Sequence, residues 1–182
     1  EIIARFKSGD KAGFNELVRR YSTRAYQIAY GVLGNKEDAE EVAQDVFIRI
    51  FKALPKFRGD AEFSTWMYRI AMNLARNKYR WNRSRGMKRN ISIEATQEND
   101  EISGRGIQVQ AESPTPDERA ELSEFENNVM TEMEKLPPLY REALVMRNVE
   151  NMSYERIAKV LDCKLGTIKS RIARAREELR KR

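Results

Sequence analysis

The sequence contains no histidine, and among its 182 residues it has one cysteine and five prolines. Without histidine the chain cannot form a His-dependent catalytic triad, and most zinc sites are excluded as well. The single cysteine, Cys163, excludes a disulfide within the chain and favours a reducing compartment. No apolar run approaches the roughly 20 residues that span a bilayer, and no signal peptide is visible. We therefore expect a soluble, cytoplasmic protein with no cofactor and no metal site.

The pattern typical of β-strands is also missing, because polar and apolar residues do not alternate over any long stretch. Apolar residues recur instead at spacings of three and four, which predicts amphipathic helices. Asp10 is suited to cap a first helix that ends at Gly34. A second helix is expected from near Lys36 to Pro55, and a third starts near Ser64. Three such helices can bury their apolar sides against one another.

The domain organisation follows from where this spacing stops and resumes. Residues 86–118 are dominated by Ser, Thr, Gly, Asn, Glu and Gln, which predicts a flexible linker without a core of its own. Helical spacing returns near Asp117, and the residues predicted to face inward are Leu122, Phe125, Val129, Met133 and Leu136. We expect an all-α protein with two small domains, over residues 1–85 and 119–182, joined by this linker.

Charge is distributed unevenly over the chain, whose net charge is +6. Residues 69–90 carry eight basic and no acidic residues, and residues 153–182 carry ten basic and four acidic ones. Between them, residues 91–152 carry five basic and 14 acidic residues. Two basic blocks around an acidic middle indicate a polyanionic partner that is held at two separate places.

The last thirty residues predict a helix-turn-helix. Ser153 is suited to cap a short helix, Gly166 permits a tight turn, and Thr167 is suited to cap the helix that follows. In that second helix Ile168 and Ile172 share an inward side, whereas the free side is basic. A helix of this kind can enter the major groove of DNA. The alternative is a helix hairpin whose charges only keep it solvated.

The third helix of the first domain carries another basic face. Its polar members recur at spacings of four, three and four: Arg69, Asn73, Arg76 and Arg80. Aromatic residues are interleaved with them: Tyr68, Tyr79 and Trp81. Phosphates pair with such cations while unstacked bases stack on aromatic rings, so this face suits single-stranded or opened DNA. The alternative is that Tyr68 and Trp81 complete the core and the arginines keep the surface soluble.

Several sequence blocks occur together, in order and at suitable separations: Phe14–Tyr21, Asp38–Phe47, Phe57–Asn73, Leu136–Pro137, Tyr154–Ala158 and Gly166–Arg171. Through these blocks the chain resembles bacterial RNA polymerase sigma factors of the extracytoplasmic-function (ECF) group, close in pattern to the sigma-E type. The resemblance covers both domains and leaves the linker unmatched in detail. It implies that the first domain corresponds to sigma region 2 and the second to sigma region 4.

The resemblance also implies roles for the residues at matching positions. Four residues of the second helix contact core RNA polymerase: Asp38, Glu41, Gln44 and Asp45. Ten residues are expected to bind the opened −10 promoter element: Phe57, Arg58, Phe63, Ser64, Thr65, Arg69, Ile70, Asn73, Arg76 and Arg80. Six residues are expected to bind the −35 element: Thr167, Lys169, Ser170, Arg171, Ala173 and Arg174. In the last set Arg171 is expected on phosphate, and Ala173 stands where relatives can have a bulkier side chain.

The function implied by the resemblance is transcription initiation rather than enzymatic catalysis. Such a factor binds core polymerase, recognises the −35 and −10 elements of promoter DNA and promotes opening, with no small-molecule substrate. An anti-sigma factor, often membrane-bound in this family, is expected to hold the sigma factor inactive at the cytoplasmic face of the inner membrane. Stress is expected to release it. The alternative function is a stand-alone helix-turn-helix regulator, which binds duplex promoter DNA tightly without polymerase. A DNA-modifying enzyme is disfavoured, because the acidic residues lie on ordinary amphipathic faces and histidine is absent.

Overall fold

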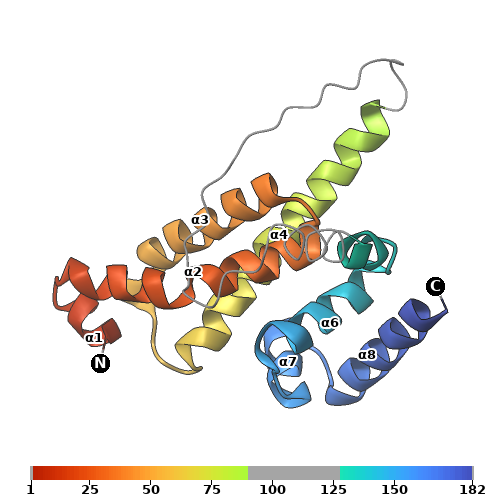
Figure 1. Cartoon of the computed structure of the whole chain (residues 1–182). Coiled ribbons are helices and arrows are strands. Elements are labelled where there is room, and N and C mark those ends of the chain that lie inside the picture. The colour runs from red at the N-terminus through yellow and green to blue at the C-terminus, as the bar shows by residue number, and fades with distance from the viewer. Residues whose placement is uncertain (1, 90–127, 182) are drawn as a thin grey trace, which may run out of the picture.

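The computed structural model describes residues 2–89 and 128–181, and all regular structure in these two ranges is helical (Figure 1). Up to residue 89 the elements are α1 (Ile2–Lys7), α2 (Lys11–Leu33), α3 (Lys36–Ala53), a 3-10 turn (Leu54–Lys56) and α4 (Phe63–Arg89). From residue 128 they are a helical stretch over 128–134, α6 (Pro138–Glu150), α7 (Tyr154–Leu161) and α8 (Leu165–Arg180). The predicted all-α fold is confirmed.

We call residues 2–89 the N-terminal module and residues 128–181 the C-terminal module. The helix α4 continues to Arg89, so it includes the first four residues of the range predicted as linker. The rest of that range and the helix start predicted near Asp117 lie outside the described residues.

The ends of α2 and α3 follow the capping residues of the sequence. Asp10 accepts a hydrogen bond of 2.8 Å from the amide of Ala12 and so satisfies a free donor at the start of α2. Gly34 ends α2 in the left-handed conformation, at a φ of 80°, which glycine adopts without a steric penalty. Asn35 then caps α3 by accepting from the amide of Asp38 at 2.8 Å. The predicted boundaries of these two helices are confirmed.

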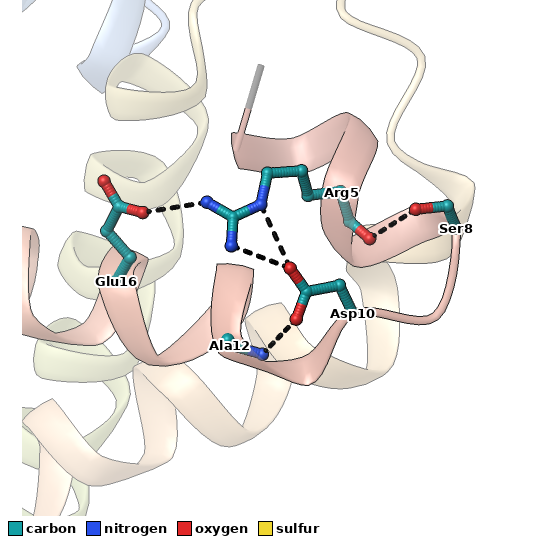
Figure 2. A network of polar contacts seen from close by, with 5 residues as sticks. All are labelled: Arg5, Ser8, Asp10, Ala12 and Glu16. Atoms are coloured by element: carbon teal, nitrogen blue, oxygen red, sulfur yellow. Dashed lines mark hydrogen bonds and ion pairs between the residues drawn. The ribbon is translucent and has the colours of Figure 1, made fainter.

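The helix α1 is not predicted by the apolar spacing, and a polar network attaches it to α2 (Figure 2). The guanidinium of Arg5 donates to Oδ2 of Asp10 at 2.8 Å and approaches Oε2 of Glu16 at 3.4 Å (Figure 2). The hydrogen bond from Arg5, followed by that from the Ala12 amide, lowers the pKa of Asp10. Asp10 therefore serves both as the cap of α2 and as the anchor of α1.

The core of the N-terminal module lies among α2, α3 and α4. Each helix contributes one buried side: Leu17, Ala25, Ile28, Ala29 and Val32 from α2, Val42, Val46 and Ile50 from α3, and Met67, Ala71, Met72 and Ala75 from α4. Most of these positions are three or four residues apart, so the apolar spacing of the sequence becomes the packing surface. At the end nearest α1, the ring of Phe14 packs edge-on against that of Phe51, with centroids 5.0 Å apart.

The C-terminal module is a helix-turn-helix, as predicted, but its turn is built differently. Ser153 caps α7 as expected, by accepting a hydrogen bond of 3.2 Å from an amide of the first turn. The chain reverses at Asp162, which adopts a left-handed φ of 51°, and Lys164 is the N-cap of α8. Gly166 lacks a positive φ and Thr167 lies inside the first turn of α8. The predicted turn at Gly166 and cap at Thr167 are wrong, because a short polar Asp tolerates the left-handed conformation that the turn needs.

Before α6, the predicted inward positions of Met133 and Leu136 are confirmed and that of Val129 is wrong, whereas Leu122 and Phe125 lie outside the described residues. Met133 is buried in a cluster with Leu144, Val145 and Ala175. Val129 is 43% exposed, because it lies a turn earlier, outside that cluster.

The two modules pack against each other, with α6 and α7 lying along α2 and α4 (Figure 1). One apolar cluster contains buried residues of both modules, among them Met72 of α4 and Ile157 of α7. The backbone of α2 comes especially close to α6 at Gly31, where an added Cβ would lie 2.7 Å from Cγ2 of Val145. Glycine is therefore required for this approach. The sequence predicts the two modules but not this contact between them.

Candidate nucleic-acid and polymerase interfaces

The residues predicted to contact polymerase share one side of α3 but differ in what surrounds them. Glu41, Gln44 and Asp45 are exposed. Asp38 is half-buried, and its carboxylate accepts hydrogen bonds from Nδ2 of Asn82 at 2.5 Å and from Nδ2 of Asn35 at 2.9 Å. The structure therefore gives Asp38 a role inside the module, in addition to any role on its surface.

Lys78 of α4 lies between the two acidic residues nearest to it on α3. Its Nζ is 3.1 Å from Oδ1 of Asp38 and 2.5 Å from Oε2 of Glu41. The hydrogen bond to Glu41 raises the pKa of Lys78, although burial opposes the shift. Burial acts in the opposite direction on Asp38 and raises its pKa, but hydrogen bonds from Asn35, Asn82 and Lys78 outweigh burial and hold that pKa below 3.8. These bonds fix the position of α3 on α4.

Aromatic rings lie beneath the loop that is predicted to accept a flipped nucleobase of the −10 element. Phe57 and Trp66 have centroids 4.8 Å apart, and Phe63 lies 5.9 Å from Trp66. Lys7 of α1 donates to the carbonyl of Phe57 at 2.5 Å, so α1 helps to hold the loop. Three half-buried rings beneath a loop form a surface on which an unstacked base can stack.

The polar residues of this loop and the start of α4 are not equally accessible. Arg58 is exposed and Ser64 is half-buried. Thr65, at 6% exposure, is buried inside the module. The prediction that Thr65 faces DNA does not fit this position, because a buried threonine on the inner side of α4 supports the fold instead.

The basic face of α4 is only partly open in this arrangement. Asn73 and Arg80 are exposed and Ile70 is half-buried, as a surface for DNA requires. Arg69 and Arg76 instead bind the C-terminal module. Arg69 donates to the carbonyl of Lys159 at 2.9 and 2.6 Å. Arg76 forms two hydrogen bonds, of 2.7 and 2.6 Å, with the carboxylate of Glu142.

The three aromatic residues near this face differ in exposure: one is buried, one is half-buried and one is exposed. Tyr68 is fully buried at 0% exposure, so its interpretation as a stacking platform is wrong and the core alternative holds for it. Trp81 is 48% exposed, and the guanidinium of Arg85 lies over its ring at 4.0 Å from the centroid. Tyr79 is half-buried beneath Arg141 of α6, whose guanidinium is 5.1 Å from the ring centroid.

The residues predicted to read the −35 element lie on α8. Lys169, Ser170, Ala173 and Arg174 are exposed along one side of this helix. Arg174 reaches the hydroxyl of Tyr140 at 3.3 Å, and this hydrogen bond raises the pKa of its guanidinium. Thr167 is half-buried and accepts a hydrogen bond on its carbonyl from Ser170 at 2.9 Å. One side of a helix with two cations and two small residues fits the major groove.

A cleft of about 510 Å³ between the modules brings arginines of both predicted DNA surfaces together. Arg76, Arg80 and Arg83 line it from α4, and Arg171 lines it from α8. Arg141 and Glu142 of α6 form part of its wall. Sequence reasoning missed Glu142 and Arg141, and no local signal marks them, because their partners in the N-terminal module, Arg76 and Val32, are more than 60 residues away along the chain.

Comparison with known proteins identifies both modules. The family model described as Sigma-70 region 2 matches residues 17–85, and the model described as Sigma-70, region 4 matches residues 126–179. The RNA polymerase sigma-H factor of Pseudomonas aeruginosa is 37% identical over 182 residues, which are 100% of this chain and 91% of that protein. The ECF RNA polymerase sigma factor SigW of Bacillus subtilis is 34% identical over 179 residues, 98% of this chain and 93% of that one.

The chain is a sigma factor of the ECF group. Its function is transcription initiation, in a family without enzymatic activity whose members act with core RNA polymerase on promoter DNA. The solved structure of CnrH in complex with the cytosolic domain of CnrY is similar to this sigma factor with a TM-score of 0.69 and 26% identity, covering 98% of this chain and 92% of that one. This similarity spans both modules.

Three further findings concern the described part of this sigma factor. Within residues 2–89 and 128–181, no helix has the length and apolar character needed to cross a membrane. In the same ranges, no three His, Cys, Asp or Glu side chains gather in a way that could hold a metal ion. Cys163 is half-buried and packs against the apolar cluster of the two modules.

Proposed function

We propose that this sigma factor binds core polymerase through the exposed side of α3. The supporting observation is that Glu41, Gln44 and Asp45 are exposed side by side on a helix that the bonds of Asp38 fix to α4. A rigid acidic surface suits a basic partner helix, since complementary charge steers association and fixes the docking register. Asp38 supports this surface from below and contacts polymerase to a smaller extent than the other three.

The polymerase surface can be tested with a double variant and a matched control. We expect Gln44→Ala with Asp45→Ala to reduce co-purification with core RNA polymerase about tenfold, because both side chains are exposed and lack a described structural partner. Asp60→Ala removes an exposed carboxylate from the −10 loop instead of α3 and is expected to leave core binding unchanged. Equal core binding by the double variant and the unaltered chain would contradict this assignment.

We assign −10 recognition to the aromatic-lined loop and the basic face of α4. Phe57 and Phe63 lie where a flipped base can stack, Arg58 of the same loop is exposed for polar contacts, and Asn73 is exposed further along α4. Arg80 continues the cationic face, and Ile70 supplies apolar contact. Three of the four remaining predicted residues, Ser64, Arg69 and Arg76, join this surface when the C-terminal module leaves it. The fourth, Thr65, is buried inside the module.

We assign −35 recognition to the exposed side of α8. Lys169, Ser170 and Arg174 lie where they can reach base edges in the major groove, with Ala173 between them. Arg171 is turned toward the flank of the helix and is assigned to a phosphate. Phosphate contacts position the helix, and the exposed side reads the sequence.

We also propose that a protein inhibitor regulates this sigma factor in the cytoplasm. CnrH, which is similar over nearly the whole chain, is seen in complex with the cytosolic domain of CnrY. An inhibitor with a membrane anchor would hold the sigma factor at the inner face of the membrane. Overexpression of this chain identifies the promoters that it activates. We expect transcription from these promoters to rise when the inhibitor is removed, and unchanged transcription would contradict the proposal.

A further inference from the structure

The short helix α1 reaches the start of the loop over residues 57–62, the −10 loop, to which the proposed function assigns the flipped base. We propose that α1 positions this loop, and that Lys7 is thereby a positioning residue for the selection of the flipped −10 base. The proposal rests on the proposed function of the loop and adds the element that holds its stacking surface in place. None of the residues of α1 is assigned to DNA or to polymerase in that function.

The contact joins a charged donor to the backbone of a residue whose ring forms the stacking surface. Nζ of Lys7 donates to the carbonyl oxygen of Phe57 at 2.5 Å, although the two residues are 50 positions apart in the sequence. The ring centroid of Phe57 is 4.8 Å from that of Trp66 and 6.2 Å from that of Phe63. Because the bond fixes the carbonyl, it restricts the backbone torsions that carry the ring of Phe57. Lys7 therefore acts on one wall of the surface on which an unstacked base can stack.

Few other contacts hold the −10 loop. The amide of Phe57 donates to the carbonyl of Leu54 at 3.1 Å, which connects the loop to the 3-10 turn. Residues 58–62 are all exposed, and an added Cβ at Gly59 would meet no atom within 4 Å. A segment with so little packing of its own takes its position from its two ends. One end is continuous with α4, and the other is fixed by Leu54 and Lys7.

The helix α1 is itself attached to the rest of the N-terminal module, so it can serve as a support. The guanidinium of Arg5 binds the carboxylate of Asp10 at 2.8 Å (Figure 2). The ring of Phe6 lies 5.7 Å from that of Phe14 on α2 and 5.4 Å from that of Phe51 on α3, measured between centroids. One polar and one aromatic anchor thus precede the lysine that contacts the loop.

A lysine at this place could act on DNA in two ways, and the two ways differ in their consequences. Lys7 is exposed, and an exposed lysine beside a DNA-binding loop can pair with a phosphate. A phosphate contact carries no sequence information, so its loss weakens binding to all promoters equally. A positioning contact matters only where the loop has a base to accept. The bond to the Phe57 carbonyl favours the second role, because it already uses the ammonium group as a donor to the loop.

The test uses holoenzyme assembled from core RNA polymerase with saturating amounts of the purified chain, on a promoter mapped from its start site. Abasic sites placed one at a time in the non-template −10 strand identify the position at which loss of the base most slows open-complex formation. We expect Lys7→Met to slow formation about fivefold on the intact promoter, as for the loss of one hydrogen bond from an exposed charged donor. On the promoter that is abasic at the identified position, the same variant should have no effect. Lys7→Arg keeps a charged donor and should retain at least half of the original rate.

Lys11→Met is the matched control, because it removes the same charge from a neighbouring exposed lysine. Lys7 and Lys11 line the same surface hollow of about 290 Å³, but no contact of Lys11 with the −10 loop is present in the described residues. Its rate should be unchanged on both promoters. Phe6→Ala removes the aromatic anchor of α1 and should cause the same base-dependent loss as Lys7→Met. Because both changes act through one contact, combining them should cause no further loss.

Equal slowing of Lys7→Met on the intact and the abasic promoters would overturn the positioning role and place Lys7 on a phosphate. An unchanged rate on the intact promoter would overturn it as well. Phe63→Ala distinguishes this result from a failure of the −10 assignment, since it removes a ring of the stacking surface itself. If Phe63→Ala gives a base-dependent loss and Lys7→Met does not, the positioning role alone is overturned. If neither variant gives one, the assignment of the loop is overturned together with it.

Discussion

Replacing Asp38 separates a structural role from a polymerase-binding one, because the sequence and the structure assign this residue differently. By sequence it belongs to the polymerase surface with Glu41, Gln44 and Asp45. In the structure its carboxylate accepts bonds from Asn82, Asn35 and Lys78 at 2.5, 2.9 and 3.1 Å. Asp38→Ala removes all three: Asn82 of α4 loses this acceptor, whereas Lys78 keeps its ion pair with Glu41.

The expected loss is about 2 kcal/mol of unfolding free energy. Each hydrogen bond contributes about 1 kcal/mol net, and the bond to Lys78 is partly screened because the side chains of Asp38 and Lys78 are 21% and 16% exposed. For a module of this size, that loss corresponds to roughly 8–16 °C in the melting temperature. Asp45→Ala, an exposed acid of the same helix, is expected to change stability by no more than about 0.5 kcal/mol.

The pH dependence of the same variant follows from the lowered pKa of Asp38. A carboxylate whose pKa is lower in the folded state stabilises the fold above its unfolded pKa, and this stabilisation is lost as the pH falls through the folded pKa. The stability difference between Asp38→Ala and the unaltered chain should therefore be full near neutral pH and shrink below a pH of 3.8. Urea unfolding at several pH values measures it. Unchanged stability together with a tenfold loss of polymerase binding would refute the structural role.

Two further predictions concern the DNA surfaces in the polymerase holoenzyme. Asn73→Ala should reduce initiation about tenfold at promoters whose −10 base it contacts and much less at −10 variants, with core binding unchanged; equal loss at all promoters, measured by transcription from a −10 variant series, would contradict base contact. Arg171→Ala should weaken binding equally across −35 variants and reduce the slope of log affinity against log salt by about one, because it removes a phosphate contact. A change in −35 sequence preference would place Arg171 on a base instead.

Features that depend on neighbours along the chain were predictable from the sequence. The caps at Asp10 and Ser153 and the stop at Gly34 are set by residues within four positions, so local chemistry predicts them. The turn before α8 shows the limit of this reasoning. Gly166 offered the familiar turn signal, yet Asp162 adopts the left-handed conformation, because either residue type can do so and the packing of α7 on α8 decides between them.

The contact between the modules was not predictable from periodicity. Helical spacing places Arg76 and Arg69 on a polar face. The spacing does not show whether such a face is free to bind DNA or instead binds Glu142 and the end of α7. The sequence left two interpretations of Tyr68 open for a related reason, since an aromatic residue beside arginines fits both a stacking surface and a core. The family resemblance predicts binding surfaces on α3, α4 and α8, and the structure shows which of their residues are accessible.

Transcription with purified core RNA polymerase tests the central claim most directly. The template carries a promoter mapped from start sites that appear when this chain is overexpressed, and the reaction is run with and without the purified chain. The account predicts transcripts from that start site only when the chain is present, and fewer with Gln44→Ala and Asp45→Ala combined. Core polymerase that starts at the same positions and rates in both reactions would contradict it.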